Sequence, residues 1–543
     1  MIKFDFRSRP SKAGYRRRSC QWLCAGLLAA AVAGCESGNQ RVSGEIGSVS
    51  GFAGAVAADE PRAVLAARDA LAAGGSAADA ATALYFALAV TLPSSAGLGG
   101  GGVCLVHEPD ADRPYVLDFL PRASADGSIG LPGNARGMAF LQARHGRMKW
   151  SQLLAPAEEL ARGTSVSRAL AADLAANSYA LLGDAESARV FGRADGGIAR
   201  EGDGIRQLDL VGTISQIRRE GAGALYAGPL AIRLALAAQD ADLALSNDTL
   251  RAVQPRVRDA LVVGIGARAA YFAPPPADGG LLGAHLAAML AQGGSYAAGG
   301  DVDRAHLFVE AAKRAVAEAG RLLEADGANG GQAITRLSQS RMESLMQDYV
   351  PDSAAPVAGT GAAFAGGDSG ATGFVVADGD GLAIACEVTL NRPFGNGRVI
   401  PGTGVILAAA PTQDGAFALG PMIAIDPDDG TVDFVGAASG GARGTQALIA
   451  AFLDAVVRGE PLGTAMAAGR VLYAGTGKGV AYEDGVGDSV VADLSQRGHV
   501  LERTAAVGRV NALWCSKGLP DDSDSCEARN DPRGNGLAVI QAD

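Results

Sequence analysis

Two apolar runs separated by a tight turn constrain the fold of this chain more than any other feature. Residues 373–377 form a short apolar run, residues 378–381 read Asp-Gly-Asp-Gly, and residues 382–390 form a second run of strand-forming composition. Two such runs joined by a turn rich in Gly and Asp are typical of a β-hairpin. The sequence therefore predicts a buried hairpin, and with it a sheet, in the last third of the chain.

The segment before this hairpin is small and polar, and hydroxyl side chains lie at the ends of the hairpin. Residues 366–372 read Gly-Gly-Asp-Ser-Gly-Ala-Thr, and Thr372, Thr389 and Asn391 follow along the hairpin. Cleavage of such a loop frees an amine beside a hydroxyl, and that pair can act as base and nucleophile. The arrangement fits a self-processing hydrolase, although a disordered linker would have the same composition over residues 351–370.

Composition limits the class of partner. The 543 residues are 48% hydrophobic and 19% charged, with a net charge of −11 and a pI near 5.1. This length supplies a sizeable core for one large domain or two ordinary ones. The acidic balance argues against nucleic acid as a partner. The five histidines are scattered and no Cys or His cluster has metal-ligand spacing, so no metal is expected.

The N-terminus has the features of a targeting segment. Three arginines at residues 16–18 precede an apolar stretch over residues 20–33, which is short for a membrane span. The stretch ends in Val-Ala-Gly followed by Cys35, which resembles the lipobox of bacterial lipoproteins, whose Cys is lipidated after cleavage. Glu36 favours sorting to the outer membrane. We expect residues 1–35 to be a lipoprotein signal peptide and the protein to lie in the periplasm or cell envelope, anchored to the membrane by its lipid. An ordinary secretion signal with a chance Cys is the alternative.

Cys20 and Cys24 lie within the expected signal peptide, and four cysteines follow it. Cys515 and Cys526 flank a polar loop, and in an oxidising compartment they are a plausible disulfide. Cys104 and Cys386 lie inside apolar, strand-like runs, and are expected to be inert buried thiols.

Helix signals are clear near the start of the ordered part. Residues 60–73 predict an amphipathic helix entered at Pro61, and Ser76 with Asp79 is a capping pair for a second helix over residues 77–90. That second helix is apolar nearly all round and should be buried. Residues 230–350 alternate Ala-rich segments with short loops and predict a helical layer.

Set in order, these pieces resemble the γ-glutamyltransferase (γ-glutamyltranspeptidase) family of N-terminal-nucleophile hydrolases over residues 53 to about 480. The residues that carry the resemblance are Ala73-Gly74-Gly75-Ser76-Ala77, Gly97-Leu98-Gly99-Gly100-Gly101-Gly102, Leu117-Asp118-Phe119, Asp378, Gly381, Thr389-Leu390-Asn391, Phe394-Gly395 and Ala438-Ser439-Gly440-Gly441-Ala442-Arg443.

The resemblance implies an α/β fold, a four-layer αββα sandwich. It also implies one interlocked domain made of a large-subunit-like region, residues 53–371, and a small-subunit-like region, residues 372–543, after a linker at residues 36–52. The two fragments produced by self-cleavage would be each other's partners. The substrate would be glutathione or another small γ-glutamyl amide, and no cofactor is needed.

By the same resemblance, Thr389 positions the free amine, Asn391 contacts substrate, and Gly440 and Gly441 donate backbone N–H groups to the oxyanion. A structural role for this Gly pair, as a strand-to-helix turn capped by Ser439, is compatible with that one.

Three positions depart from the family pattern. The nucleophile position falls on Ala371, with Thr372 next to it. Leu120 stands where the family has an Arg that binds the substrate carboxylate, and Arg122 lies two residues on. The Ser-Ser pair of the family falls on Gly420-Pro421. If the chain is active, we expect Thr372 to be the nucleophile, with cleavage between Ala371 and Thr372.

Three functions follow from these residues. The first is an exported enzyme that hydrolyses or transfers the γ-glutamyl group of glutathione or related amides. The second is a related acylase with a different, less polar acyl substrate. The third is a non-catalytic family member that acts as a binding lipoprotein.

Overall fold

A computed structural model describes most of the chain after the expected targeting segment. The described residues are 51–109, 111–326, 337–356, 370–411, 417–475 and 479–542. Cys35 and the expected signal peptide lie outside them, as does nearly all of the expected linker. Among the described residues, no helix combines the length and apolar character that a membrane span requires.

A seven-stranded antiparallel sheet forms the centre of the molecule and contains the hairpin expected from the sequence. Its strands, in spatial order, are β22 (Leu537–Gln541), β1 (Gly54–Ala58), β10 (Ala371–Asp378), β11 (Ala383–Thr389), β2 (Gly101–His107), β3 (Tyr115–Asp118) and β7 (Arg256–Asp259). In this sheet β1, from before residue 371, lies between β22 and β10, and β10 and β11 lie between β1 and β2, so the two regions share one sheet.

A second antiparallel sheet of six strands packs against the first. In spatial order its strands are β21 (Cys526–Asn530), β20 (Arg509–Leu519), β16 (Val432–Ser439), β15 (Met422–Ile425), β9 (Arg268–Phe272) and β8 (Leu261–Ile265). The sequence was expected to be helical over residues 230–350, and β7, β8 and β9 correct this expectation. In β8, buried and exposed residues alternate, which is the two-residue period of a strand.

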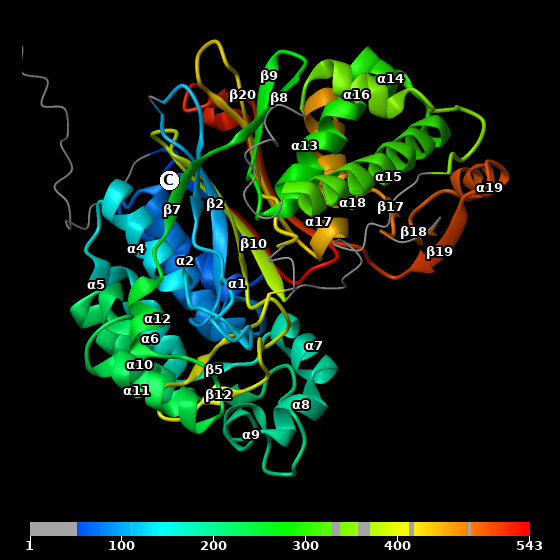
Figure 1. The fold of residues 1–543 in the computed structure, drawn as a ribbon. Coiled ribbons are helices and arrows are strands. Elements are labelled where there is room, and N and C mark those ends of the chain that lie inside the picture. Colours follow the sequence, from blue (N-terminus) through cyan, green and yellow to red (C-terminus); the bar gives the residue numbers. More distant parts are fainter. Residues whose placement is uncertain are drawn as a thin grey trace, which may run out of the picture. The chain divides into compact units, whose positions relative to one another are not determined.

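Helices cover the outer face of each sheet (Figure 1). Helices α1 (Pro61–Ala72) and α2 (Ala77–Thr91) pack on the first sheet, and α13 (Asp278–Ala291) and α17 (Gly441–Phe452) pack on the second, with α15 (Asp301–Asp326) beyond them. Separate apolar cores fill the space between helices and first sheet, between the two sheets, and between second sheet and helices. This order of layers is the expected αββα sandwich.

Among the described residues, further helices and strands complete the fold. The remaining helices are α3 (Pro93–Ala96), α4 (Asn134–His145), α5 (Trp150–Leu153), α6 (Ala155–Arg162), α7 (Arg168–Ala176), α8 (Ser178–Gly183), α9 (Ala185–Phe191), α10 (Leu208–Glu220), α11 (Pro229–Asp240), α12 (Asn247–Ala252), α14 (Ser295–Ala298), α16 (Gln339–Met346), α18 (Leu462–Ala467) and α19 (Asp488–Gln496), with one-turn helices η1 (Ala222–Leu225), η2 (Gln292–Gly294) and η7 (Ser523–Ser525) and a π-helix, η6 (Leu453–Val457). The remaining strands are β4 (Ile129–Gly130), β5 (Thr164–Ser165), β6 (Gly204–Ile205), β12 (Val399–Ile400), β13 (Val405–Ile406), β14 (Ala408–Ala409), β17 (Val471–Tyr473), β18 (Gly479–Glu483) and β19 (Val500–Thr504).

The residues that predicted a helix start and a hairpin turn make the expected contacts. Ser76 and Asp79 make a capping box at the start of α2. Asp378 ends β10, and its Oδ1 accepts hydrogen bonds from the backbone N–H groups of Asp380 and Leu382, which closes the hairpin turn. Its Oδ2 accepts from the N–H of Ala77 at 2.8 Å, so the same carboxylate joins the hairpin to the first turn of α2.

All four cysteines among the described residues are paired. Cys515 and Cys526 lie opposite each other on β20 and β21 and form a disulfide. Cys104 and Cys386 lie opposite each other on β2 and β11 and form a second disulfide. The expectation that Cys104 and Cys386 are inert thiols was therefore wrong. Both strands were predicted, but the sequence did not reveal that they pair across 282 residues and so bring the two sulfurs together.

Candidate active site

The register of the hairpin decides which side chain occupies the nucleophile position. Ala371 begins β10 and lies opposite Thr389, the last residue of β11. Ala371 is 1% exposed and belongs to the core between the sheets, as do Val375 and Ala377, which share its face of the strand. The strand has not slipped by one residue. At the position where the family resemblance expects a hydroxyl, the structure has the methyl group of Ala371.

Thr389 and Leu390 bind the carbonyl of the peptide bond that precedes Ala371. The Thr389 hydroxyl donates to the carbonyl of Gly370 at 3.2 Å, and the N–H of Leu390 donates to the same carbonyl at 3.1 Å. Thr389 Oγ1 also accepts from the N–H of Asn391 at 2.8 Å, and the Asn391 amide donates to the carbonyl of Ala409 at 2.9 Å. Asn391 adopts a φ of 64°, in the left-handed region that Asn tolerates better than most residues other than glycine.

The Thr372 hydroxyl is held by a carboxylate that the sequence reading did not single out. Thr372 is fully buried, and its Oγ1 donates to Oδ2 of Asp59 at 2.8 Å. Asp59 follows β1 directly, and its Oδ1 accepts from the Asn511 amide at 2.9 Å. The same amide donates to the carbonyl of Gly373, and the Ser439 hydroxyl lies 3.4 Å from Asp59 Oδ2. The structure thus places a proton acceptor beside Thr372 and links it to both sheets.

Glu387 is a second buried carboxyl group in this region. It lies opposite Gly373 on β11, and its two oxygens accept from the N–H groups of Ala438, at 2.7 Å, and Gly420, at 2.8 Å. Burial raises the pKa of Glu387 from 4.5 to about 8, against the lowering effect of the two N–H donors, and the negative charge of Asp59 adds to the rise. Glu387 therefore keeps its proton to a higher pH than an exposed glutamate does.

Gly440 and Gly441 form the turn between β16 and α17. Their φ angles of 107° and 62° are in the left-handed region, where a side chain would be strained. Among the described residues, neither the Gly440 N–H nor the Gly441 N–H donates a hydrogen bond outside the regular pattern of helices and strands. Both N–H groups lie at the N-terminal end of α17 and can receive an oxyanion. Gly440, and not Ser439, is the N-cap of the helix, because the Ser439 hydroxyl interacts with Asp59 and Arg509.

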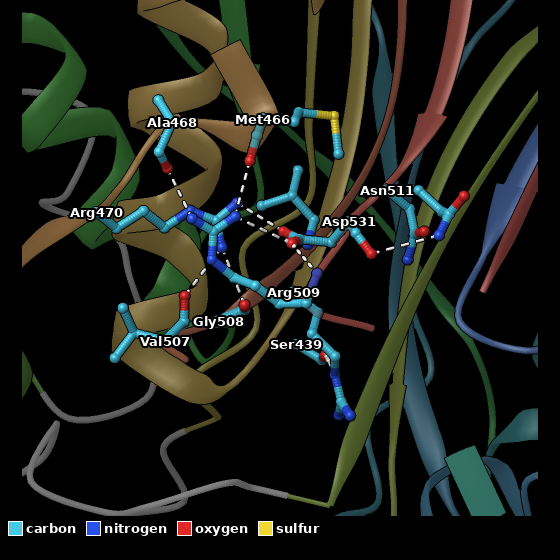
Figure 2. A network of polar contacts seen from close by, with 12 residues as sticks. Ser439, Met466, Ala468, Arg470, Val507, Gly508, Arg509, Asn511 and Asp531 are labelled. Carbon is cyan, nitrogen blue, oxygen red and sulfur yellow. Dashed lines mark hydrogen bonds and ion pairs between the residues drawn. The ribbon is translucent and has the colours of Figure 1, made fainter. Parts of the chain in front are cut away.

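A buried ion pair supports the loop behind this turn (Figure 2). The Arg470 guanidinium donates to the carbonyls of Val507, at 2.9 Å, and Gly508, at 3.0 Å, and to Asp531 Oδ2 at 2.6 Å. A Cβ at Gly440 would lie 3.0 Å from the Cα of Gly508. Arg470 thus fixes the loop against which the Gly turn packs.

The expected substrate-binding Arg122 is engaged elsewhere. Its guanidinium donates to Asp118 Oδ2 at 2.7 Å, and Arg258 approaches the same carboxylate at 3.6 Å. No hydrogen bond or ion pair between Arg122 and Asn391 is found among the described residues. Leu120, where the family resemblance expects an Arg, is 3% exposed and lies in the core between the sheets.

Within the described part of the chain, one compact group of potential metal ligands lies outside this region. The ligand atoms of His306, Glu310 and His499 lie within 4.8 Å of one another. Lys313 and Arg314 each donate to a Glu310 oxygen at 2.7 Å, and Lys313 also lies 3.3 Å from His499 Nδ1. Two cationic groups occupy the carboxylate that a metal ion would need, so this cluster is a hydrogen-bond network within the helical layer.

Asp59, Glu387 and Asn511 were missed by sequence reasoning. A weak signal existed for the two acids, since Glu387 is the one charge in the apolar run at residues 382–390, and Asp59 directly follows the apolar residues of β1. Neither signal says which side chains face them. The contacts of Asp59 with Thr372 and Asn511 join residues more than 300 positions apart, and the contacts of Glu387 with Gly420 and Ala438 join residues 33 and 51 positions apart.

Comparison with known proteins gives a consistent result. The family model described as Gamma-glutamyltranspeptidase matches residues 63–414 and 417–540. "Scoloptoxin SSD14" of Scolopendra dehaani is 30% identical over 358 residues, which cover 61% of this chain and 62% of that protein. "Glutathione hydrolase proenzyme" of Pseudomonas aeruginosa is 26% identical, over 90% of this chain and 94% of that protein. The crystal structure of cephalosporin acylase from Bacillus halodurans matches with a TM-score of 0.78 and 21% identity, over 92% of this chain and 97% of that one.

Proposed function

Because the chain belongs to the gamma-glutamyltranspeptidase family, we propose that it is a self-processing amide hydrolase or acyltransferase whose acyl substrate lacks the carboxylate of a γ-glutamyl group. One observation carries the choice of acyl group. Leu120, at the position of the carboxylate-binding Arg, lies in the same apolar core as Ala371, Phe417 and Leu419. Apolar side chains at the position where the family holds the substrate carboxylate favour a neutral acyl group.

Two further contacts support this choice. Arg122 is the cation nearest in sequence to Leu120, and its guanidinium is already paired with the buried Asp118. The N–H of Gly420, where the family has a Ser, donates to Glu387. A bidentate Arg and two hydroxyls contribute roughly several kcal/mol to carboxylate recognition, and nothing among these contacts replaces them. Glutathione would therefore be a poor substrate.

In the proposed mechanism, Asp59 takes the proton of the Thr372 hydroxyl. Oγ1 attacks the carbonyl carbon of Ala371, the C–N bond to Thr372 breaks, and the proton passes from Asp59 to the departing amine. Water then hydrolyses the resulting ester, which leaves Thr372 as a new N-terminus. In turnover, the free amine of Thr372 serves as the base, and the Gly440 and Gly441 N–H groups stabilise the oxyanion.

A reducing denaturing gel of the purified mature protein tests self-cleavage. At 54.6 kDa over 543 residues, a chain beginning at Cys35 would give fragments of about 34 and about 17 kDa. Thr372→Ala should give a single uncut band, while Thr372→Ser should still be cut. Asp59→Asn keeps the hydrogen-bonding shape but cannot take a proton, and should slow cleavage strongly. N-terminal sequencing of the small fragment should begin at Thr372; a start at another residue would move the nucleophile.

A paired assay tests the acyl specificity. The processed protein is given p-nitroanilides of γ-glutamate and of neutral acyl groups of similar length, and kcat/KM is compared. Faster release from the neutral anilides is expected, and the acyl amide implied by the name of the cephalosporin acylase is the class to try first. A clear preference for the γ-glutamyl anilide would contradict the proposal and favour a γ-glutamyltransferase.

The second candidate is a non-catalytic binding protein with this fold. The observation that favours it is the register of β10, which puts a methyl group at the nucleophile position and leaves the Thr372 hydroxyl fully buried. A single band on the reducing gel, together with a Thr372→Ala variant that behaves as wild type, would select this candidate.

We also propose that the protein is exported and anchored through a lipid on Cys35. The two disulfides support an oxidising compartment, because such bonds persist outside the reducing cytosol.

A further inference from the structure

The Cys104–Cys386 disulfide lies across the proposed cleavage site in the sequence. Cys104 is on β2, in the region before residue 371, and Cys386 is on β11, in the region after it. Both residues are fully buried. The other disulfide, Cys515–Cys526, has both ends after residue 372, so it cannot connect the two regions.

We propose that Cys104–Cys386 is an inter-subunit bridge that keeps the two fragments in one covalent molecule after self-cleavage. The proposal rests on the self-cleavage between Ala371 and Thr372 proposed above. Cutting one peptide bond in a loop closed by a disulfide leaves the two pieces joined through the sulfurs. The bond therefore converts what would be a dissociable heterodimer into a single covalent unit.

The bridge joins the strands on which the site depends. In the sheet, β11 lies between β10, which begins the small fragment, and β2, which belongs to the large fragment. Thr389 lies opposite Gly101 in the ladder between β11 and β2, three residues from the bridge. A crosslink at this point holds the strand that carries Thr389 against the large fragment even when the rest of the sheet opens.

The bridge changes how many separate chains unfolding produces. Two separate fragments unfold into two chains, so their apparent stability falls on dilution. Two fragments joined by the bridge unfold into one crosslinked chain, and their stability does not depend on protein concentration. For a protein anchored to the membrane through Cys35 of its large fragment, the bridge prevents loss of the small fragment.

Gels with and without reductant test the bridge in the processed protein. Without reductant, wild type should run as one band of about 51 kDa, the combined mass of its fragments, and with reductant as the two fragments. A variant with both Cys104→Ala and Cys386→Ala should show two bands under both conditions. The control with Cys515→Ala and Cys526→Ala should behave as wild type. Separation of the wild-type fragments without reductant would overturn the proposal.

Chemical cleavage at methionine tests the bond without relying on self-cleavage. Under denaturing, non-reducing conditions, cyanogen bromide cuts after Met138, Met346 and Met422, so that Cys104 and Cys386 fall on different peptides. The peptide ending at Met138 should be linked to the one that ends at Met422, and reduction should separate them. Finding two free thiols at Cys104 and Cys386 would show that the bridge does not exist. If the peptides are linked but the chain is never cut, the disulfide is an intrachain bond. That result would refute self-cleavage and, with it, the inter-subunit role.

Dilution of the processed protein tests the effect of the bridge on stability. The urea midpoint of bridged wild type should stay constant over an approximately hundredfold range of protein concentration, and that of the Cys104→Ala, Cys386→Ala variant should fall on dilution. A wild-type midpoint that falls equally would show that the fragments separate despite the bond, and the proposal would fail.

Discussion

The buried carboxyl group of Glu387 should make the stability of the protein decrease as the pH rises through neutrality. Glu387 is 2% exposed, and burial raises its pKa from 4.5 to about 8. Because the folded state holds this proton more tightly than the unfolded state, the stabilising effect is fully present below about pH 4.5. It is lost as the pH rises to about 8.

The size of the effect follows from the pKa difference. One pKa unit corresponds to about 1.36 kcal/mol, so a rise from 4.5 to about 8 corresponds to up to about 5 kcal/mol. The comparison that isolates it is Glu387→Gln, which has nearly the same shape and does not titrate. The variant loses one acceptor for the Ala438 or Gly420 N–H, but this cost does not depend on pH.

Urea unfolding of both proteins at several pH values between 4 and 9 measures the effect. The free energy of unfolding of wild type, minus that of the variant, should fall by about 1.4 kcal/mol per pH unit between roughly pH 5 and 8. Glu318 is a matched control of opposite sign. Burial alone would raise its pKa, but the guanidinium groups of Arg321 and Arg341 outweigh burial and lower it to about 2. The corresponding difference for Glu318→Gln should be flat above pH 5 and decline only as the pH falls toward 2. A flat difference for Glu387 across the range would show that folding does not raise its pKa, and would refute the reasoning.

Three further outcomes are expected. Cys35→Ser should abolish incorporation of labelled palmitate and release the protein from membranes; equal labelling of the variant would contradict lipidation. Gly440→Ala should lower the unfolding free energy by about 1–3 kcal/mol and abolish turnover, because φ is 107° and the new Cβ would crowd the neighbouring loop. The control Gly430→Ala, at φ 77° in open space, should show only the backbone cost and keep activity. Replacing both Cys515 and Cys526 by Ala should lower the unfolding free energy by about 2–3 kcal/mol, measured by urea unfolding, since the bond closes a short loop; no change would mean that the loop is already ordered when unfolded.

The sequence predicted the elements that rest on local signals. The hairpin at residues 373–390 and the capping pair Ser76 and Asp79 need only neighbouring residues, and both formed as expected. Strands β8 and β9 were missed because they are short and lie within an Ala-rich stretch, where composition favours helix. Their identity is decided by pairing with each other and with β15, which a single sequence does not reveal.

The site was predicted only as far as the family resemblance reached. Thr389, Asn391 and the Gly pair at residues 440–441 were named because they match a pattern. Asp59 and Asn511 have no pattern to match, and Asn511 comes from the opposite sheet. The contacts of Asp59 with Thr372 and with Asn511 depend on how the two sheets pack, so the structure was needed to find them.

The shift of the hydroxyl from residue 371 to residue 372 requires a different proton acceptor. Residues at even and odd positions of a strand face opposite sides, so Thr372 shares its side of β10 with Phe374 and Val376, which pack in the core on the side of α1 and α2. Groups arranged around residue 371, such as the Thr389 hydroxyl on the Gly370 carbonyl, are then directed at the wrong peptide bond. Before cleavage no free amine exists to serve as base. The carboxylate of Asp59, 2.8 Å from the Thr372 hydroxyl, supplies what the shifted position lacks. A chain that had merely lost its nucleophile would have no need of a buried acid at this point, and burial of an acid is costly unless it is hydrogen-bonded. The three side chains that contact Asp59 are therefore the strongest structural reason to test Thr372 as a working nucleophile.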